Sequence, residues 1–172
     1  MTQKHRLDEI NSLTGEEFVR IIGAVFEHSP WIAEATWGER PFASLEELHR
    51  ALCEMVESAG GEKQLALIRA HPDLVGQAAL AVTLTRASNS EQASAGLDKL
   101  APGEIATFQT FNRTYHEKFG FPFVICARLN KKEAILAGFK KRLRNSRPEE
   151  IKTALEQIRQ IAYLRLKDII QT

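Results

Sequence analysis

The sequence predicts an all-α fold, a single compact bundle of about seven to eight helices over residues 1–172 with one short extended segment. Three observations predict this fold. Apolar residues recur at helical spacing along most of the chain, helix-capping sequences precede several of these stretches, and only one stretch has the composition of a strand. A length of 172 residues is also typical of a single domain.

In the first half of the chain, T-x-x-E at 14–17 and S-x-x-E at 44–47 each precede a stretch whose apolar residues form one helix face. The glycines at 60–61 are expected to end the second of these helices. A shorter helix is expected over 62–70. It should stop near residues 71–72 (His-Pro), because a residue before proline disfavours the α region.

In the second half, Pro102 has the position of a first helical residue, and an apolar stripe follows it as far as Gly120. Asn130 is expected to cap the next helix, and Ser146 the last one. The segment 121–127 (FPFVICA) is apolar and partly β-branched, so we expect it to be extended. Because the sequence contains no second strand-like stretch, the backbone amides of this segment need other partners, and a ligand is one candidate.

Composition excludes several classes of protein. Hydrophobic residues make up 44% of the chain and charged residues 26%, which is typical of a globular protein. No apolar run approaches the ~18 residues that a membrane span needs, and the first residues lack the apolar stretch of a secretory signal. Cys53 and Cys126 have no zinc-type spacing, which favours buried thiols in a reducing compartment. We therefore expect a cytoplasmic protein.

Charge is distributed unevenly along the chain. Residues 1–127 contain 11 Lys/Arg and 17 Asp/Glu, whereas residues 128–172 contain 12 and 5. A basic C-terminal third could attract nucleic acid, an anionic metabolite or an acidic partner. No interleaved aromatic residues or recognition motif accompany the densest basic run, so a solvated helix end is the favoured interpretation. That run comprises Lys140, Lys141, Arg142, Arg144 and Arg147.

Arg165 is the least expected residue of the last helix. It has a core-facing position in the apolar stripe that runs from residue 151 to residue 169, between Leu164 and Leu166. A buried guanidinium needs a partner. Its forked geometry suits a carboxylate or a planar amide ligand, but a buried ion pair with an internal Glu or Asp fits the spacing equally well. Both interpretations stay open at this point.

Two further stretches carry candidate chemistry. In 71–74 (HPDL), the proline fixes His71, a residue type suited to proton transfer near neutral pH, although a simple capping role is the commoner one. In 88–92 (SNSEQ), the S-x-x-E sequence predicts a capping box. Such a box would also hold Glu91 in place as an acid or base, and the Gln92 amide could bind a polar heterocycle.

Together with Arg165, these stretches would supply a proton donor, a carboxylate, an amide and a cation for an anionic polar substrate. Other chemistries find no support in the sequence. It contains no HExxH or clustered metal-ligand spacing, so no metal site is expected. It also contains no GxGxxG, P-loop or GxSxG motif.

Four stretches occur in the order and with the separations of one known family. They are LIRAHPDL (67–74), SNSEQASAGL (88–97), FNRTYHEKFGFPFVICAR (111–128) and IAYLRL (161–166). With them the chain resembles the 2-oxo-4-hydroxy-4-carboxy-5-ureidoimidazoline (OHCU) decarboxylases. The resemblance covers most of residues 10–170, and the four stretches together are highly specific.

The resemblance implies an all-helical, usually homodimeric enzyme that uses neither a metal nor an organic cofactor. The family decarboxylates OHCU to (S)-allantoin, the last step of the uricase route from urate. The expected partner is therefore a small ureidoimidazoline substrate, with no role for nucleic acid or a membrane.

By the same resemblance, the catalytic residues are His71, Glu91 and Arg165. The expected substrate contacts are Pro72, Ser88, Gln92 and the extended segment that lines the site, namely Phe123, Val124, Ile125, Cys126 and Ala127. Two other functions remain open from the residues themselves. One is a hydrolase or isomerase of a related ureide, and the other is a helical interaction module that uses the basic face.

Overall fold

The structure is a computed structural model that describes residues 4–76 and 84–171. Within these ranges it contains nine α-helices and three short 3-10 helices, and its only β pairing is one isolated bridge. The predicted all-α class is confirmed. Two helices of six residues each, α1 (Leu7–Ser12) and α3 (Trp31–Thr36), were not predicted from the sequence.

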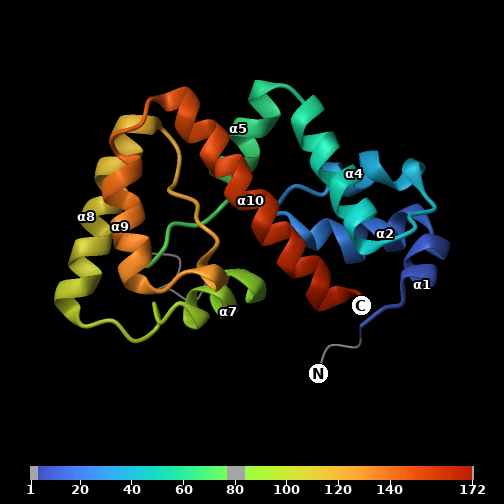
Figure 1. Cartoon of the computed structure of the whole chain (residues 1–172), viewed down its shortest axis with the longest axis horizontal. Coiled ribbons are helices and arrows are strands. Elements are labelled where there is room, and N and C mark those ends of the chain that lie inside the picture. Colours follow the sequence, from blue (N-terminus) through green and yellow to red (C-terminus); the bar gives the residue numbers. More distant parts are fainter. Residues whose placement is uncertain (1–3, 77–83, 172) are drawn as a thin grey trace. The chain divides into compact units, whose positions relative to one another are not determined.

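The chain divides into two compact units, residues 1–70 with 159–172 (unit 1) and residues 71–158 (unit 2). Figure 1 shows the helices of both units. Besides α1 and α3, unit 1 contains α2 (Gly15–Ile22), α4 (Leu45–Ser58), α5 (Gly61–Arg69), η1 (Gly23–Val25), η2 (Trp37–Glu39) and the C-terminal part of α10 (Arg147–Ile169).

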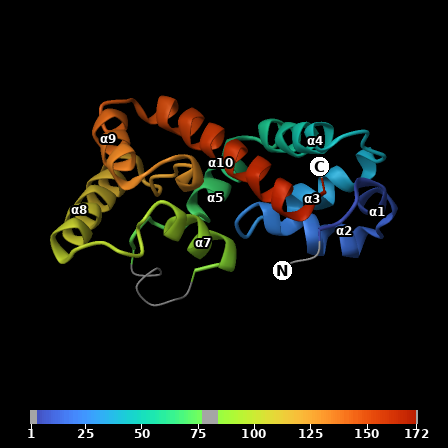
Figure 2. The same ribbon diagram turned by 60° about the horizontal axis from the view of Figure 1, so that its bottom comes forward.

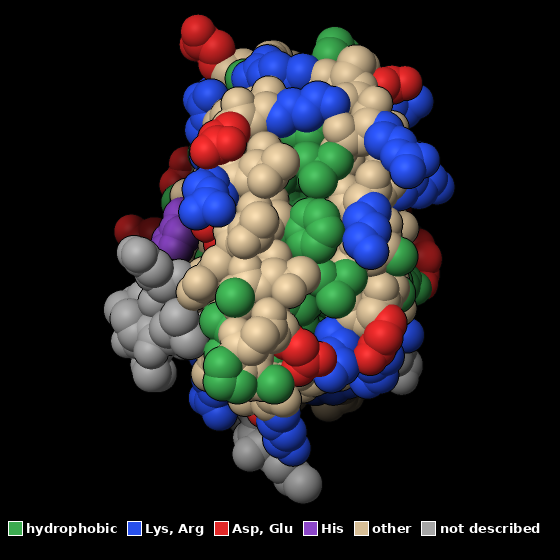
Figure 3. Space-filling view, turned by 90° about the vertical axis from the view of Figure 1, so that its left-hand side faces the viewer, with side chains coloured by type: hydrophobic (Ala, Val, Ile, Leu, Met, Phe, Trp, Pro, Cys, Tyr) green, Lys and Arg blue, Asp and Glu red, His purple; other side chains and the backbone are tan. Residues whose placement is uncertain are grey.

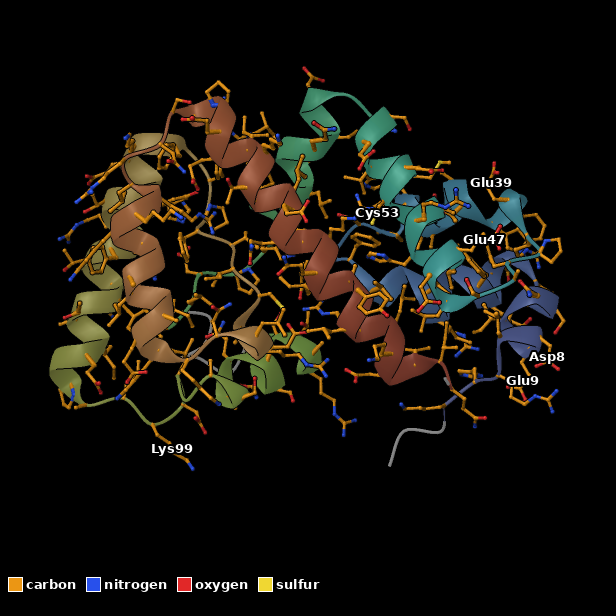
Figure 4. The ribbon with its side chains drawn as sticks, in the orientation of Figure 1. Asp8, Glu9, Glu39, Glu47, Cys53 and Lys99 are labelled. Atoms are coloured by element: carbon orange, nitrogen blue, oxygen red, sulfur yellow. The ribbon has the colours of Figure 1, made fainter. Side chains whose placement is uncertain are left out.

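The caps expected in unit 1 are present. The Thr14 side chain accepts a hydrogen bond from the Glu17 backbone N–H at the start of α2, and Ser44 does the same for Glu47 at the start of α4. Figure 4 labels Glu47 on α4. Between α4 and α5, Gly60 has a φ of +81°, a backbone conformation that residues other than glycine rarely adopt.

Unit 1 has its own apolar core, in which the helices expected from periodicity bury their apolar faces. Its fully buried side chains include Ile10, Phe18, Ile22, Ile32, Leu48, Leu52, Leu67 and Ile68. The chain ends also pair within this unit. The His5 backbone N–H donates to the Ile169 carbonyl at 2.8 Å, and the Gln171 N–H donates to the His5 carbonyl at 2.9 Å.

Unit 2 is formed by α7 (Arg86–Ser94), α8 (Pro102–Phe119), η3 (Ala127–Leu129), α9 (Lys132–Arg142) and the N-terminal part of α10. Figures 1 and 2 both show α8 beside α9. Aromatic rings fill the space between them: Phe139 stacks on Phe123 with ring centroids 3.8 Å apart and on Phe111 at 5.3 Å. Gly120 ends α8 with a φ of +77°, as expected.

Two expected caps in unit 2 are wrong. Ser88 does not cap α7: the cap is Thr85, whose side chain accepts the Ser88 backbone N–H at 3.2 Å, so Ser88 is the third helical residue. Asn130 does not cap α9, which begins one residue later after Lys131. The Asn130 side chain instead donates to the Cys126 carbonyl at 2.9 Å, which directs its amide toward the preceding segment.

Candidate active site

The loop that follows α5 carries the first two candidate residues. The helix ends at Arg69, as expected from the proline at 72. His71 is buried, with 8% of its surface exposed, and Pro72 is partly exposed. A buried histidine beside a proline has little conformational freedom, so its imidazole is held in a defined position.

The same loop contains backbone strain. Val75 has a φ of +54°, in the left-handed region that a β-branched residue adopts only when its surroundings impose it. Gly76 packs so closely that a Cβ atom at this position would lie 2.7 Å from the Asp73 Cβ. Strain of this kind is concentrated at functional sites in proteins. The loop 71–76 is therefore a candidate for a function beyond linking two helices.

Three side chains from the neighbouring helices hold this loop. The Gln92 side chain accepts the Val75 backbone N–H at 3.1 Å and donates to the Asp73 carbonyl at 3.3 Å. Asn112 of α8 donates to the Leu74 carbonyl at 2.7 Å. One turn further along α8, His116 pairs with the Asp73 carboxylate at 2.8 Å. These contacts stabilise the strained conformation from two sides.

We expect Gly76→Ala to destabilise the protein by about 1–3 kcal/mol, because the added methyl group must displace Asp73 from its packed position. Thermal unfolding of the purified variant measures this loss. Gly38→Ala is the matched control, since a Cβ there would meet nothing within 4 Å. Equal stability of the two variants would contradict the close packing of the loop.

Helix α7 carries three other candidates. Ser88 and Gln92 are buried, and Glu91 is half-buried. As described above, the Gln92 amide binds the loop 71–76, so its observed contacts are with the protein backbone. The contacts of Gln92 with the loop 71–76 were not predicted from the sequence.

The segment 123–127 lies close to the same helix. Helix α7 packs against η3, which begins at Ala127, and Lys131 donates to the Ser94 carbonyl at 2.8 Å. Burial raises the pKa of the Cys126 thiol, and the negative charge of Glu91 raises this pKa further. Unit 2 therefore brings the loop 71–76, α7 and the segment 123–127 together.

Of the segment expected to be extended over 121–127, residues 121–126 lie in neither a helix nor a paired strand, whereas Ala127 begins η3. Most side chains of residues 121–126 are buried. Protein side chains bind part of the backbone of this segment. Arg142 of α9 donates to the Val124 carbonyl at 2.6 Å, and the Gln157 side chain of α10 accepts the Cys126 N–H at 2.9 Å. In the described ranges, the backbone N–H and C=O of Ile125 have no hydrogen bond to protein.

Arg165 belongs to unit 1 and is 5% exposed, which confirms its core-facing position. Its guanidinium donates to the Glu27 carboxylate at 2.8 Å and to the Val25 carbonyl at 3.2 Å. Glu27 is 2% exposed. The buried ion pair, one of the two interpretations left open above, is therefore present.

The basic run at the end of α9 is not uniformly solvated. Arg142 is 7% exposed and paired with the fully buried Glu150, so the expectation of a solvated helix end is wrong for this residue. Lys140, Lys141 and Arg144 are exposed, as expected. The face that α8 and α9 form shows hydrophobic side chains between Lys and Arg side chains (Figure 3).

The remaining sequence expectations concern cysteines, metals and membranes. Cys53, labelled in Figure 4, and Cys126 are both buried and form no disulfide within the described residues, as expected. Over residues 4–76 and 84–171, no three His, Cys, Asp or Glu side chains gather as they do in metal sites. No helix in the described part of the chain has the length and apolar character needed to cross a membrane.

Comparison with known families identifies the chain. The model of the OHCU decarboxylase family matches residues 11–167. The chain belongs to the OHCU decarboxylase family. The resemblance found in four short stretches of the sequence therefore extends over nearly the whole chain.

Relatives within this family are similar over almost their full length. The 2-oxo-4-hydroxy-4-carboxy-5-ureidoimidazoline decarboxylase of Haloferax volcanii is 44% identical, over 94% of this chain and 94% of that protein. The enzyme of the same name from Halalkalicoccus jeotgali is 42% identical, over 95% of this chain and 90% of that protein.

A solved structure supports the fold assignment. The crystal structure of an (S)-allantoin synthase superimposes with a TM-score of 0.79 and 26% identity over 97% of this chain. This chain covers 54% of that protein, so it spans about half its length.

Proposed function

We propose that this OHCU decarboxylase family member removes CO2 from OHCU and releases (S)-allantoin, the last step in the conversion of urate to allantoin. One observation carries the proposal. A buried histidine lies in a strained loop that Gln92 fixes from α7, the helix that also carries Glu91. A fixed proton donor and a carboxylate within one unit suit a reaction in which a carboxylate leaves and a proton takes its place.

In the proposed reaction, the bond between the ring carbon and its carboxylate breaks, and CO2 leaves. The electron pair stays on the ring carbon and is delocalised into the ring of the substrate, which therefore serves as its own electron sink. A proton from the His71 imidazole then bonds to that carbon. Because the histidine is fixed in a packed loop, it would deliver the proton to one face only and so give one enantiomer.

The other residues would bind and orient the substrate. Glu91 would hold the hydroxyl or ureido group and turn the scissile carboxylate out of the ring plane. The backbone of Phe123–Ala127 would bind the ring and ureido groups, with Pro72, Ser88 and Gln92 as further contacts. Such fixed hydrogen-bond partners lower the barrier because they need no reorganisation during the reaction.

For Arg165 we propose a hydrogen bond to a substrate oxygen from its forked guanidinium. The ion pair with Glu27 explains by itself why an arginine is buried at this position. Arg165→Lys tests the substrate contact separately from the ion pair.

The homodimer that the resemblance implies and the cytoplasmic location expected from the sequence are also proposals. Light scattering coupled to size-exclusion chromatography tests the first of them. For a dimer we expect a mass of about 39 kDa, twice the 19.3 kDa of one chain. Elution at the mass of a single chain at micromolar concentration would contradict it.

The activity is tested with OHCU labelled with 13C in its carboxylate and generated in situ from urate. We expect the purified chain to release labelled CO2 faster than the spontaneous decay does, in proportion to the protein concentration. Release at the spontaneous rate, from protein that circular dichroism shows to be folded, would contradict decarboxylation. Related ureides would then be the next substrates to examine, since the sequence analysis left a hydrolase or isomerase open.

A further inference from the structure

We infer that Arg142 and Gln157 are positioning residues that fix the backbone of the substrate-binding segment 123–127, an inference that rests on the proposed function. Neither residue is among the catalytic or substrate-contacting residues proposed above. Each binds the backbone of the segment directly, Arg142 at the Val124 carbonyl and Gln157 at the Cys126 N–H. One comes from α9 and the other from α10.

Arg142 connects the segment to a buried polar network. Its guanidinium Nε donates to Glu150 at 2.9 Å, while another nitrogen, Nη1, donates to Val124 at 2.6 Å. Its Cζ atom also lies 4.2 Å from the centroid of the Phe123 ring. Glu150 has no exposed surface, and it accepts further hydrogen bonds from the Tyr115 hydroxyl and the Asn145 amide. Arg142 is thereby held in one orientation.

The chemistry of this network suggests a role in geometry. A buried ion pair adds little net stability compared with apolar residues of the same volume. A planar guanidinium, however, can bind a carboxylate with one nitrogen and a carbonyl with another at the same time, which neither an apolar side chain nor a lysine can do. The network therefore accounts for how a segment without regular secondary structure keeps one conformation inside a helical unit.

These contacts also indicate which backbone groups are left for a ligand. The Val124 carbonyl and the Cys126 N–H are bound by Arg142 and Gln157, and the Cys126 carbonyl accepts hydrogen bonds from the Leu129 N–H and the Asn130 side chain. The N–H and C=O of Phe123 and of Ile125 make no hydrogen bond to the described residues, and of the two residues Ile125 is the one that is partly exposed. A ring or ureido amide could bind both groups of Ile125 at once, because one is a donor and the other an acceptor.

The first test compares Gln157→Leu with Gln157→Glu in the full chain. Leucine removes the acceptor for the Cys126 N–H, whereas glutamate keeps one and serves as the conservative rescue. Since one hydrogen bond is involved, we expect Gln157→Leu to raise KM for OHCU by roughly five-fold with kcat changed by less than about two-fold, and Gln157→Glu to restore most of the loss. Hydrogen exchange of the Cys126 amide should rise by a similar factor in the leucine variant.

The second test is Arg142→Lys, with Arg144→Lys as its matched control in the same basic run. Lysine preserves the positive charge beside Glu150 but cannot at the same time donate to the Val124 carbonyl. We therefore expect KM for OHCU to rise roughly ten-fold or more, and hydrogen exchange in peptides spanning 121–130 to increase. Arg144 is exposed, and its replacement should change neither quantity.

A merely structural role predicts a different pattern, in which the variants lower the melting temperature and the active fraction while KM and the exchange of this segment stay unchanged. That pattern would overturn the inference. If the wild-type chain fails to turn over OHCU, the proposed function fails by itself. The exchange comparison without substrate still decides whether Arg142 and Gln157 anchor the segment.

Discussion

His71→Asn is expected to lower kcat by about 10²–10⁴-fold, the usual contribution of a general acid, while the protein stays folded. Asparagine is similar in size and keeps a polar group near the position of Nδ1, but its amide cannot transfer a proton near neutral pH. The measurement is the initial rate of OHCU decarboxylation by the wild type and the variant under identical conditions.

The stability of the same variant is the control. Since the loop 71–76 is held through the Asp73, Leu74 and Val75 backbone by Gln92 and Asn112, replacing the His71 side chain leaves those contacts in place. The melting temperature should therefore change much less than the rate. Normal turnover by His71→Asn, with a product of unchanged chirality, would exclude His71 as the proton donor.

The second large effect concerns the buried pair in unit 1. Glu27→Leu is expected to destabilise the protein by about 3–5 kcal/mol, because it removes a carboxylate that pairs with the buried Arg165 guanidinium. Chemical denaturation followed by circular dichroism measures this change.

The matched control is Glu57→Ala. It removes the carboxylate of an exposed ion pair with Arg159, which lies on α10, the helix that also carries Arg165. Exposed pairs of this kind contribute about 0–1 kcal/mol. A loss in Glu27→Leu no greater than that in Glu57→Ala would contradict the structural importance of the buried pair.

Arg165→Lys separates the two roles considered for Arg165. Lysine keeps the positive charge beside Glu27 but lacks the fork, so we expect a small loss of stability together with a clear rise in KM for OHCU. If stability instead falls as far as in Glu27→Leu and KM stays unchanged, Arg165 acts only within the ion pair.

Much of the fold follows from local sequence patterns. Helix starts at Thr14, Ser44 and Ser146 were predicted because a short polar side chain and a glutamate three residues later satisfy the first backbone N–H groups of a helix. Thr85 and Ser88 show the limit of this pattern. Both can cap a helix, the glutamate favoured Ser88, and yet the helix begins one turn earlier at Thr85.

The candidate site was predicted only as a set of residue positions. Periodicity identified Arg165 as core-facing, but Glu27, its partner, is 138 residues away in sequence and has no local feature that connects the two. The same holds for Gln157 and Cys126, and for Asn112 and Leu74, which are 31 and 38 residues apart. A helical period shows which face of a helix is buried, but it does not show which polar group lies opposite.

If the chain decarboxylates OHCU and His71 directs the proton to one face, the product is (S)-allantoin alone. Circular dichroism follows that product while uricase and hydroxyisourate hydrolase generate OHCU in situ. With the wild-type chain we expect a growing optical signal of (S)-allantoin, and with His71→Asn we expect no lasting signal, because spontaneous decay gives a racemic product whose two enantiomers cancel. A flat signal from folded wild-type protein, or an equal signal from His71→Asn, would contradict this expectation.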